Sequence, residues 1–272
     1  MMSTALTKCI YATVLSTESY LPGVIKLYKS IKKTKSSYPF VCGCSMNIAD
    51  STMTSLKEQG IECLRLDRCA IEDISTFNFS KEQEHWKYTF DKLLLFGLTQ
   101  YKRIVYLDSD MIVLENIDEL FSCKSFSAVA AGKLVHPEWD RLNSGILVIE
   151  PDVKAMDKML ELIPVVYEKR FEQGLMTGDQ DVMNEYKKDW SASAELILPE
   201  SYNVFFKYLH LYHKKFGFCY HNNDREKSIK VVHFVGRTKP WSDKVVKKLL
   251  LVIKFFFSMD YRLNAYLRFL KL

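Results

Sequence analysis

The chain has 272 residues and a formal net charge of +5, with 48% hydrophobic and 26% charged residues. This composition is typical of a globular protein, and the length allows one large domain or two small ones with a buried core. It excludes a disordered chain, a collagen-like chain and a small disulfide-stabilised protein. Neither of two common phosphate-binding motifs, GxGxxG and GxxxxGK[ST], occurs in the sequence.

The spacing of apolar residues predicts strands and helices that alternate along most of the chain. Strands are expected at residues 10–15, 40–45, 61–66, 104–107, 145–149 and 230–234. Helices are expected at residues 20–33, 50–59, 88–98, about 152–170 and about 179–187, and in the segment from Asp243 onward. Alternation of this kind favours a mainly parallel α/β sheet flanked by helices.

The positive charge is concentrated in one segment. Between residues 237 and 272, nine Lys and Arg stand against two Asp, so the remainder of the chain has a net charge of −2. A body that is nearly neutral argues against a nucleic-acid partner, because such proteins usually carry a basic face. The basic segment therefore needs a local explanation.

The seven cysteines are odd in number, form no CxxC pair and stand partly in apolar runs such as residues 40–44. They predict reduced, mostly buried thiols in a cytoplasmic protein. The first residues lack the basic region and cleavage site of a secretory signal. The longest apolar stretch, residues 249–257, is far shorter than the roughly 20 residues that span a bilayer.

Two carboxylates follow directly on the apolar strand predicted at residues 104–107. Asp108 and Asp110 are spaced i, i+2, which in an extended chain points both side chains to the same side. They emerge at the carboxyl end of a parallel strand, where α/β sheets bind ligands. Oxygen ligands in this place suit Mg²⁺ or Mn²⁺ together with a diphosphate. The alternative is a pair of solvated turn acids.

A histidine lies near the end of the strand predicted at residues 230–234, and a glycine and a lysine follow it. His233 can be a third metal ligand, because imidazole suits Mn²⁺ as well as Zn²⁺. Gly236 would let the backbone approach a phosphate, and Lys239 would neutralise it. The alternative is a core histidine followed by a basic surface turn.

Two further segments place short polar groups at the ends of predicted elements, where they could bind sugar hydroxyls. The first is residues 143–145 (Asn-Ser-Gly), just before a strand, and the second is residues 178–181 (Gly-Asp-Gln-Asp), at a helix start. Asp179 could equally be a helix N-cap.

The order and spacing of these motifs resemble the glycogenin-like glycosyltransferase family 8. The resemblance covers roughly residues 8–241 and rests on five segments: residues 101–121, 143–151, 178–184, 198–203 and 232–241. It implies a GT-A fold, a single Rossmann-like mixed sheet flanked by helices, over residues 1–241, followed by a basic, aromatic helical tail at 242–272. It also implies an enzyme that transfers a hexose, glucose or galactose, from a UDP-sugar with retention of configuration.

The resemblance implies roles for individual residues. Asp108, Asp110 and His233 match the family's metal ligands, and the metal is usually Mn²⁺, with Mg²⁺ as the alternative. Asp179 matches a carboxylate that binds donor-sugar hydroxyls, and Gln180 lies beside the anomeric carbon. The expected donor-binding residues are Val14, Ser16, Tyr20, Lys92, Asp108, Ser109, Asp110, Asn143, Ser144, Gly236 and Lys239. A front-face route without a covalent protein nucleophile is expected, in which the acceptor hydroxyl attacks beside the departing diphosphate.

The chain departs from glycogenin at two points. Met176 stands where glycogenin has an acidic residue, and the segment between residues 203 and 233 is longer. Tyr208 and Tyr212 are candidates for a self-glucosylated tyrosine, and the sequence does not choose between them. The acceptor stays open among a lipopolysaccharide or other glycan, a small polyol as in galactinol synthases, and a protein. A scaffold that binds the nucleotide sugar without turnover is the non-catalytic alternative.

The tail at 242–272 interleaves basic residues with Leu, Ile and Phe. A basic, aromatic helix can lie on an anionic membrane surface, so our hypothesis for the tail is peripheral attachment to the cytoplasmic face of a membrane. The alternative is a helix packed on the domain with its lysines solvated.

One more cluster contains potential metal ligands. Its members are His210, His213, Cys219 and His221. Their spacing matches no common zinc module, so we interpret them as surface or acceptor-pocket residues.

Overall fold

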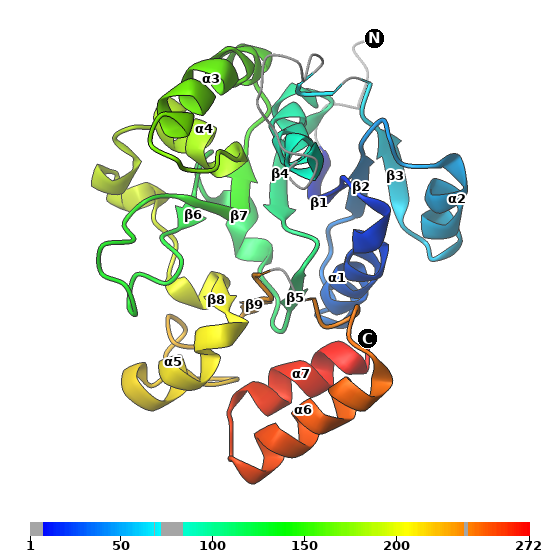
Figure 1. Ribbon diagram of the computed structural model, residues 1–272, viewed down its shortest axis with the longest axis vertical. Coiled ribbons are helices and arrows are strands. Elements are labelled where there is room, and N and C mark those ends of the chain that lie inside the picture. Colours follow the sequence, from blue (N-terminus) through cyan, green and yellow to red (C-terminus); the bar gives the residue numbers. More distant parts are fainter. Residues whose placement is uncertain (1–7, 68, 72–83, 237–238) are drawn as a thin grey trace.

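A six-stranded mixed sheet runs through the molecule and is flanked by helices (Figure 1). The computed structural model describes residues 8–67, 69–71, 84–236 and 239–272. The strand order is β3-β2-β1-β4-β7-β6. The first four strands in this order are parallel, and β7 and β6 are antiparallel to their neighbours. A second sheet has the order β5-β9-β8.

The strands of the two sheets are β1 (Lys8–Leu15), β2 (Phe40–Cys44), β3 (Glu62–Arg65), β4 (Tyr101–Leu107), β5 (Met111–Val113), β6 (Ala128–Val129), β7 (Asn143–Ile149), β8 (Val204–Phe205) and β9 (Val231–His233). The α-helices are α1 (Leu21–Lys33), α2 (Asp50–Glu58), α3 (Val153–Phe171), α4 (Asp179–Tyr186), α5 (Leu209–Phe216), α6 (Val245–Phe257) and α7 (Arg262–Leu270). The 3₁₀ segments are η1 (Glu18–Tyr20), η3 (Glu84–Gly97), η4 (Asp118–Ser122), η5 (Trp190–Ala192), η6 (Ala194–Leu196), η7 (Glu200–Tyr202) and η8 (Phe206–Tyr208).

Local sequence explains where several helices begin and which face they bury. Helix α1 has a proline in its first turn, where no backbone N–H is needed, and it buries Val24, Leu27 and Ile31 at helical spacing. Asp152 caps α3, since its side chain accepts a hydrogen bond of 2.8 Å from the backbone N–H of Lys154. These signals are local, so the sequence was sufficient to predict both helices.

The predicted α/β fold with its mainly parallel sheet is confirmed, and the structure adds elements that the sequence analysis did not predict. Strands β5, β6 and β8 have only two or three residues, too few to show an alternating pattern. The helix expected at residues 88–98 is the 3₁₀ segment η3. Buried residues there include Phe90, Leu93 and Phe96, a spacing of three that suits a 3₁₀ helix as well as an α-helix.

The second sheet matters for the site because it joins two distant parts of the sequence. Strand β5 pairs antiparallel with β9, which brings Met111 opposite His233. Strand β8 pairs parallel with β9, with Phe205 opposite His233. The residue that precedes β5 is Asp110, so the pairing places His233 beside this acid.

The C-terminal segment forms two helices, with α7 lying between α6 and the rest of the molecule (Figure 1). Ala265, Tyr266 and Phe269 of α7 are buried, and Ala265 and Phe269 pack with residues of β8 and β9. The expectation of a helical tail is therefore confirmed, but as a hairpin whose second helix is part of a hydrophobic core. The division into a domain of residues 1–241 and a tail of residues 242–272 stays a prediction.

Helix α6 exposes much of its apolar surface. The large apolar residues exposed on α6 and just after it are Val245, Val246, Leu249, Leu250, Ile253, Phe256, Phe257 and Met259. Among the residues that the structure describes, no helix has both the length and the apolar character needed to cross a membrane.

Candidate active site

A cleft of about 470 Å³ opens at the carboxyl ends of β1 and β4, the edge where parallel α/β sheets bind ligands. It is lined by Val14, Ser16, Thr17, Tyr20, Thr89, Lys92, Tyr106, Asp108, Ser109, Asp110, Ser144, Met176, Gly178, Asp179, Gln180 and Asp181. Ten of the predicted site residues are in this list, although they come from five separate parts of the chain. The cleft therefore gathers most of the motifs singled out in the sequence.

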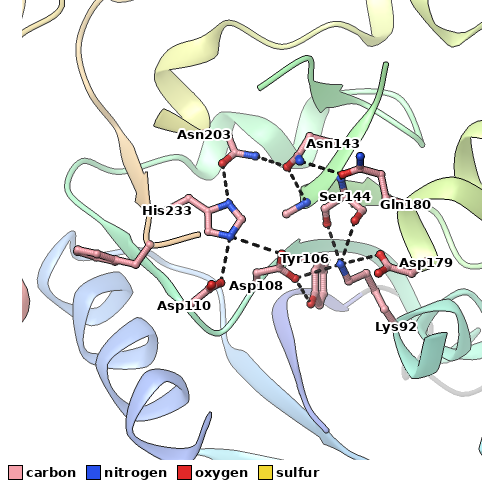
Figure 2. A network of polar contacts seen from close by, with 12 residues as sticks. Lys92, Tyr106, Asp108, Asp110, Asn143, Ser144, Asp179, Gln180, Asn203 and His233 are labelled. Atoms are coloured by element: carbon pink, nitrogen blue, oxygen red, sulfur yellow. Dashed lines mark hydrogen bonds and ion pairs between the residues drawn. The ribbon is translucent and has the colours of Figure 1, made fainter. Parts of the chain in front are cut away.

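A cluster of three potential metal ligands lies at the cleft. Ligand atoms of Asp108, Asp110 and His233 all lie within 4.8 Å of one another. The Nε2 atom of His233 is 3.0 Å from Oδ1 of Asp110 and 3.7 Å from Oδ2 of Asp108 (Figure 2). Asp110 is buried, which opposes its ionisation, but His233 and Lys239 hold its pKa below the usual value. The interpretation as solvated turn acids is therefore wrong for Asp110.

This donor set of two carboxylates and one imidazole fits Mn²⁺, and the hard oxygen ligands also suit Mg²⁺. A hydrogen bond on the far side of the ring supports the fit. Nδ1 of His233 lies 3.0 Å from Oδ1 of Asn203, and an amide oxygen can only accept. Nδ1 therefore donates to Asn203, and Nε2, the atom facing the carboxylates, is the one placed to bind a cation.

Asn203 belongs to a chain of amide contacts that runs from the metal cluster to α4. Its Nδ2 donates to Oδ1 of Asn143 over 2.7 Å. Asn143 in turn donates from its own Nδ2 to Oε1 of Gln180 over 2.9 Å, and the backbone N–H of Ser144 donates to the same oxygen. Figure 2 shows these residues side by side. The network fixes the position of Gln180 relative to His233.

Lys92 bridges two acids that come from different parts of the chain. Its Nζ is 3.0 Å from Oδ1 of Asp108 and 2.8 Å from Oδ2 of Asp179, and it donates to the carbonyl and hydroxyl oxygens of Ser144. Burial alone would lower the pKa of Lys92, yet the two carboxylates raise it above its usual value. Tyr106 completes the group by donating a hydrogen bond of 2.6 Å to Asp108.

Asp179 is the first residue of α4, and Gly178 is the N-cap, so the alternative of Asp179 as N-cap is wrong. Asp181 takes the capping role, since its Oδ2 accepts a hydrogen bond of 3.1 Å from the backbone N–H of Gly178. Arg170 pairs with Asp181 at 3.1 Å and holds it in place. The carboxylate of Asp179 is therefore left to the cleft and to Lys92.

Lys239 and Gly236 extend the site beyond β9. Lys239 forms an ion pair with Asp110, donates to the carbonyl of Phe234 over 3.0 Å and lies over the ring of Tyr20. Gly236 has a φ of +113°, a conformation that only glycine adopts readily, so the turn before Lys239 requires it. Gly236 and Lys239 are not among the residues that line the cleft, and neither are Asn143 and His233. Of these four residues, Lys239, Asn143 and His233 each contact a residue that does line it.

Some residues of the site were given no individual role by the sequence analysis. They are Thr17, Thr89, Tyr106 and Asn203, the last of which ends the segment 198–203 that carried part of the resemblance. Tyr106 could have been found, because strand alternation places it on the same side as Asp108 and Asp110. No local signal in the sequence points to Asn203, whose contacts are with residues 30 and 60 positions away.

The remaining candidates lie elsewhere. Tyr212 is fully buried and its hydroxyl donates to Glu200, so it cannot accept a sugar without leaving the core. Tyr208 is half-buried, with its hydroxyl 2.7 Å from Nε2 of His136. The residues of the zinc-like cluster do not converge on one point. Within the described parts of the chain, Asp108, Asp110 and His233 are the only group of three or more such ligands close enough to share an ion.

The family model for glycosyl transferase family 8 matches residues 12–245. Glycogenin-1 of Mus musculus is 31% identical over 240 residues, which cover 85% of this chain and 65% of that protein. Inositol phosphorylceramide glucuronosyltransferase 1 of Arabidopsis thaliana is 29% identical over 248 residues, which cover 86% of this chain and 42% of that protein. The chain thus spans less than two thirds of the length of these relatives.

Solved structures also resemble the fold. A crystal structure of the galactosyltransferase LgtC, in complex with donor and acceptor sugar analogues, gives a TM-score of 0.61 at 15% identity, covering 88% of this chain and 91% of that one. The glycosyltransferase GlyE of Streptococcus pneumoniae gives 0.57 at 17% identity, covering 88% of this chain and 57% of that one. At this identity the likeness concerns the fold, which is that of the GT-A glycosyltransferases. The chain belongs to glycosyltransferase family 8.

Proposed function

We propose that the protein is a metal-dependent, retaining hexosyltransferase that moves glucose or galactose from a UDP-sugar to an acceptor hydroxyl. The observation that carries the proposal is the convergence of Asp108, Asp110 and His233 at one end of a cleft that also contains Asp179 and Gln180. Family membership and the resemblance to glycogenin-1 support the same reaction class.

In this proposal Asp108, Asp110 and His233 hold Mn²⁺, or alternatively Mg²⁺. A bound divalent cation would supply Lewis-acid stabilisation of the leaving diphosphate. Lys239, beside Asp110, is placed to add a second positive charge at the diphosphate. The cleft residues Val14 and Ser16, at the end of β1, and Tyr20, in η1, are assigned to the uridine.

The remaining donor contacts are assigned to the sugar. Asp179 accepts donor hydroxyls, Gln180 lies beside the anomeric carbon, and Asn143 and Ser144 border the ring. Asp179 is paired with Lys92 at 2.8 Å, which lowers its nucleophilicity and supports a front-face route without a covalent intermediate on the protein. In that route the departing diphosphate takes the proton of the acceptor hydroxyl, while the protein positions both substrates.

Donor turnover tests the proposal. Purified protein with Mn²⁺ is offered UDP-glucose, UDP-galactose, UDP-N-acetylglucosamine and UDP-N-acetylgalactosamine in turn, and released UDP is measured. UDP-glucuronate joins the panel because one relative is a glucuronosyltransferase. We expect release from UDP-glucose or UDP-galactose that requires metal. Asp110→Ala should abolish this release, whereas Asp152→Ala, which removes an exposed helix cap, should retain it.

Two outcomes would contradict parts of the proposal. Metal-dependent binding of UDP without turnover of any donor, with acceptors present, would favour the non-catalytic scaffold. Absence of UDP binding in the presence of Mn²⁺ would contradict both. The acceptor class, whether glycan, lipid-linked glycan, small polyol or protein, is then identified by offering each class to the active enzyme.

We further propose that α6 attaches the protein peripherally to the cytoplasmic face of a membrane. Its exposed apolar residues and its lysines, among them Lys247 and Lys248, match an amphipathic helix on an anionic surface. The test is sedimentation with vesicles of phosphatidylglycerol and phosphatidylcholine. Replacing Leu249, Leu250 and Phe257 with serine should abolish binding while the buried α7 remains in place. Unchanged binding of this variant would refute the proposal.

A further inference from the structure

An aromatic group lies near the active site but outside the cleft that we assign to the donor. We define the aromatic shelf as His136, Trp139 and Tyr208. The rings of His136 and Trp139 stack with centroids 4.1 Å apart and planes 19° from parallel, and Nε2 of His136 lies 2.7 Å from the hydroxyl of Tyr208. Trp139 is 38% exposed even though its indole already has a stacking partner.

Residues outside the aromatic shelf also hold it in place. The carboxylate of Glu200 accepts hydrogen bonds from the backbone N–H groups of Gly132 (3.1 Å) and Leu134 (2.7 Å). Gly132 has a φ of +88°, and a Cβ there would lie 2.8 Å from the ring of Trp139. The indole thus packs on a glycine backbone that Glu200 fixes. Such a preorganised aromatic surface loses little conformational entropy when a ligand binds.

The shelf lies beside the reacting end of the proposed site. Residues 130–142 connect β6 to β7, and β7 begins with Asn143, which bonds to Gln180. The ring of Phe205 contacts both regions, with centroids 5.6 Å from His233 and 6.4 Å from Tyr208. At the end of the connection, Arg141 lies 3.7 Å from Asp181 on the cleft wall. The shelf therefore continues the site on the side away from β1.

We propose that the aromatic shelf binds a sugar ring of the acceptor, and that the acceptor is an oligosaccharide or glycoside. This inference rests on the proposed function, in which the nucleotide lies near β1 and the donor sugar near Asn143. The acceptor then approaches from the β6–β7 side, where the shelf is. A sugar offers an apolar C–H face to an indole and hydroxyls to the imidazole and phenol beside it.

The position of the aromatic shelf outside the donor cleft also has a consequence for the length of the acceptor. His136, Trp139 and Tyr208 are absent from the lining of the donor cleft. The proposal therefore expects an acceptor of more than one ring, with one part beside Gln180 and another on the shelf. A free monocyclic polyol would contact only one of these two places, so the shelf favours a longer carbohydrate.

The test separates donor binding from acceptor binding. Wild-type protein, Trp139→Ala, Trp139→Phe and Phe171→Ala are applied to an array of immobilised oligosaccharides in the presence of UDP and Mn²⁺, and UDP affinity is measured in solution. Phe171 is an exposed aromatic residue at the end of α3 and serves as the matched control. We expect Trp139→Ala to lose at least tenfold in oligosaccharide retention, Trp139→Phe to lose less, and Phe171→Ala to match wild type, with UDP affinity equal in all four proteins.

Two results would overturn the inference while leaving the proposed function intact. The first is retention of the same oligosaccharides by Trp139→Ala and wild type. The second is a wild-type protein that binds UDP with Mn²⁺ but retains no oligosaccharide on the array. A wild-type protein that fails to bind UDP with Mn²⁺ would overturn the proposed function itself, and the inference with it.

Discussion

The imidazole of His233 packs directly against the backbone of Gly145, where a Cβ would lie 2.7 Å from its Cε1 atom. The same Cβ would meet the side chain of Met111 at 2.8 Å. The glycine of the Asn-Ser-Gly motif is thus required by a metal-ligand candidate 88 positions away in the sequence.

We expect Gly145→Ala to displace His233 and to weaken Mn²⁺ affinity at least tenfold. Overpacking should also cost about 1–3 kcal/mol in the free energy of unfolding. Metal titration followed by calorimetry, together with urea unfolding, checks both values. Gly43→Ala is the control, because a Cβ there meets its neighbours only at ordinary contact distances of 3.5 Å or more. Equal metal affinity in Gly145→Ala and wild type would contradict the assigned packing.

Asn203 contacts His233 on the side of the ring away from Asp108 and Asp110. Because Oδ1 of Asn203 accepts from Nδ1 of His233, Asn203→Ala frees the ring to rotate or to change tautomer. We expect a loss of about 10–100-fold in metal affinity, as is typical for such supporting partners. Saturating Mn²⁺ should restore most of the turnover, and Asn203→Asp, which keeps the accepting oxygen, should lose less. A variant that saturation does not rescue would indicate a role beyond orientation.

Lys92 neutralises two carboxylates in a buried setting. Lys92→Met should lower the free energy of unfolding by about 3–5 kcal/mol, because it leaves Asp108 and Asp179 without their shared cation. The pKa of Lys92 is raised in the folded state, so this stabilisation is complete below the unfolded pKa of about 10.4 and is lost only as pH rises through the folded value.

The stability difference between wild type and Lys92→Met should therefore be the same at pH 6 and pH 9, as measured by urea unfolding. Lys102→Met, on the exposed side of β4, provides the control and should change stability by less than about 0.5 kcal/mol. A difference below about 1 kcal/mol for Lys92→Met would show that the two acids do not depend on this lysine.

The contribution of Asp118 to the free energy of unfolding should depend on pH in the acid range. Asp118 is not among the residues that line the cleft. It accepts hydrogen bonds from the hydroxyls of Tyr11 (2.7 Å) and Ser36 (2.6 Å) and from the backbone N–H of Ser37. Partial burial favours the protonated form, but these donors lower the pKa of Asp118 below its usual value. Its contribution to stability is therefore present above the unfolded pKa and is lost as pH falls through the folded pKa.

We expect Asp118→Asn to be less stable than wild type by about 1–2 kcal/mol at pH 7. The difference should shrink as the pH is lowered from 4 toward 2.5, which urea unfolding at each pH can measure. A difference that stays constant over this range would mean that the ionised form of Asp118 is not the stabilising one.

The two helices of the C-terminal hairpin should respond differently to the same substitution. Phe269 of α7 is 1% exposed, with Nζ of Lys26 lying 4.7 Å from its ring centroid, so Phe269→Ala should cost about 3–5 kcal/mol. Phe257 of α6 is 80% exposed, so Phe257→Ala should change stability by less than about 0.5 kcal/mol. Thermal unfolding checks both, and similar losses would mean that α6 is covered in solution.

Much of this molecule could be predicted from the sequence because the relevant signals are local. Apolar spacing is sufficient for α1, α3 and the longer strands, since three to five neighbouring residues decide which face is buried. The position of Asp108 and Asp110 follows from a strand that ends in acids, whose placement at the carboxyl edge is a property of any parallel sheet. The strand-end position of His233 and the helix-start position of Asp179 were also visible locally, and the family resemblance then gave them roles and added Lys92.

Only the tertiary structure decided which segments that are distant along the chain contact one another. The pairing of β5 with β9 joins residues 111 and 233, and each strand has only three residues, too few to specify its partner locally. The amide chain through Asn203, the burial of Tyr212 and the opposite exposure of α6 and α7 depend on the same second sheet. The sequence by itself therefore determined the longer helices and strands and the acids of the site. The packing of short, non-local elements determined which residues meet those acids, because the free energy of such contacts exists only when the whole chain is folded.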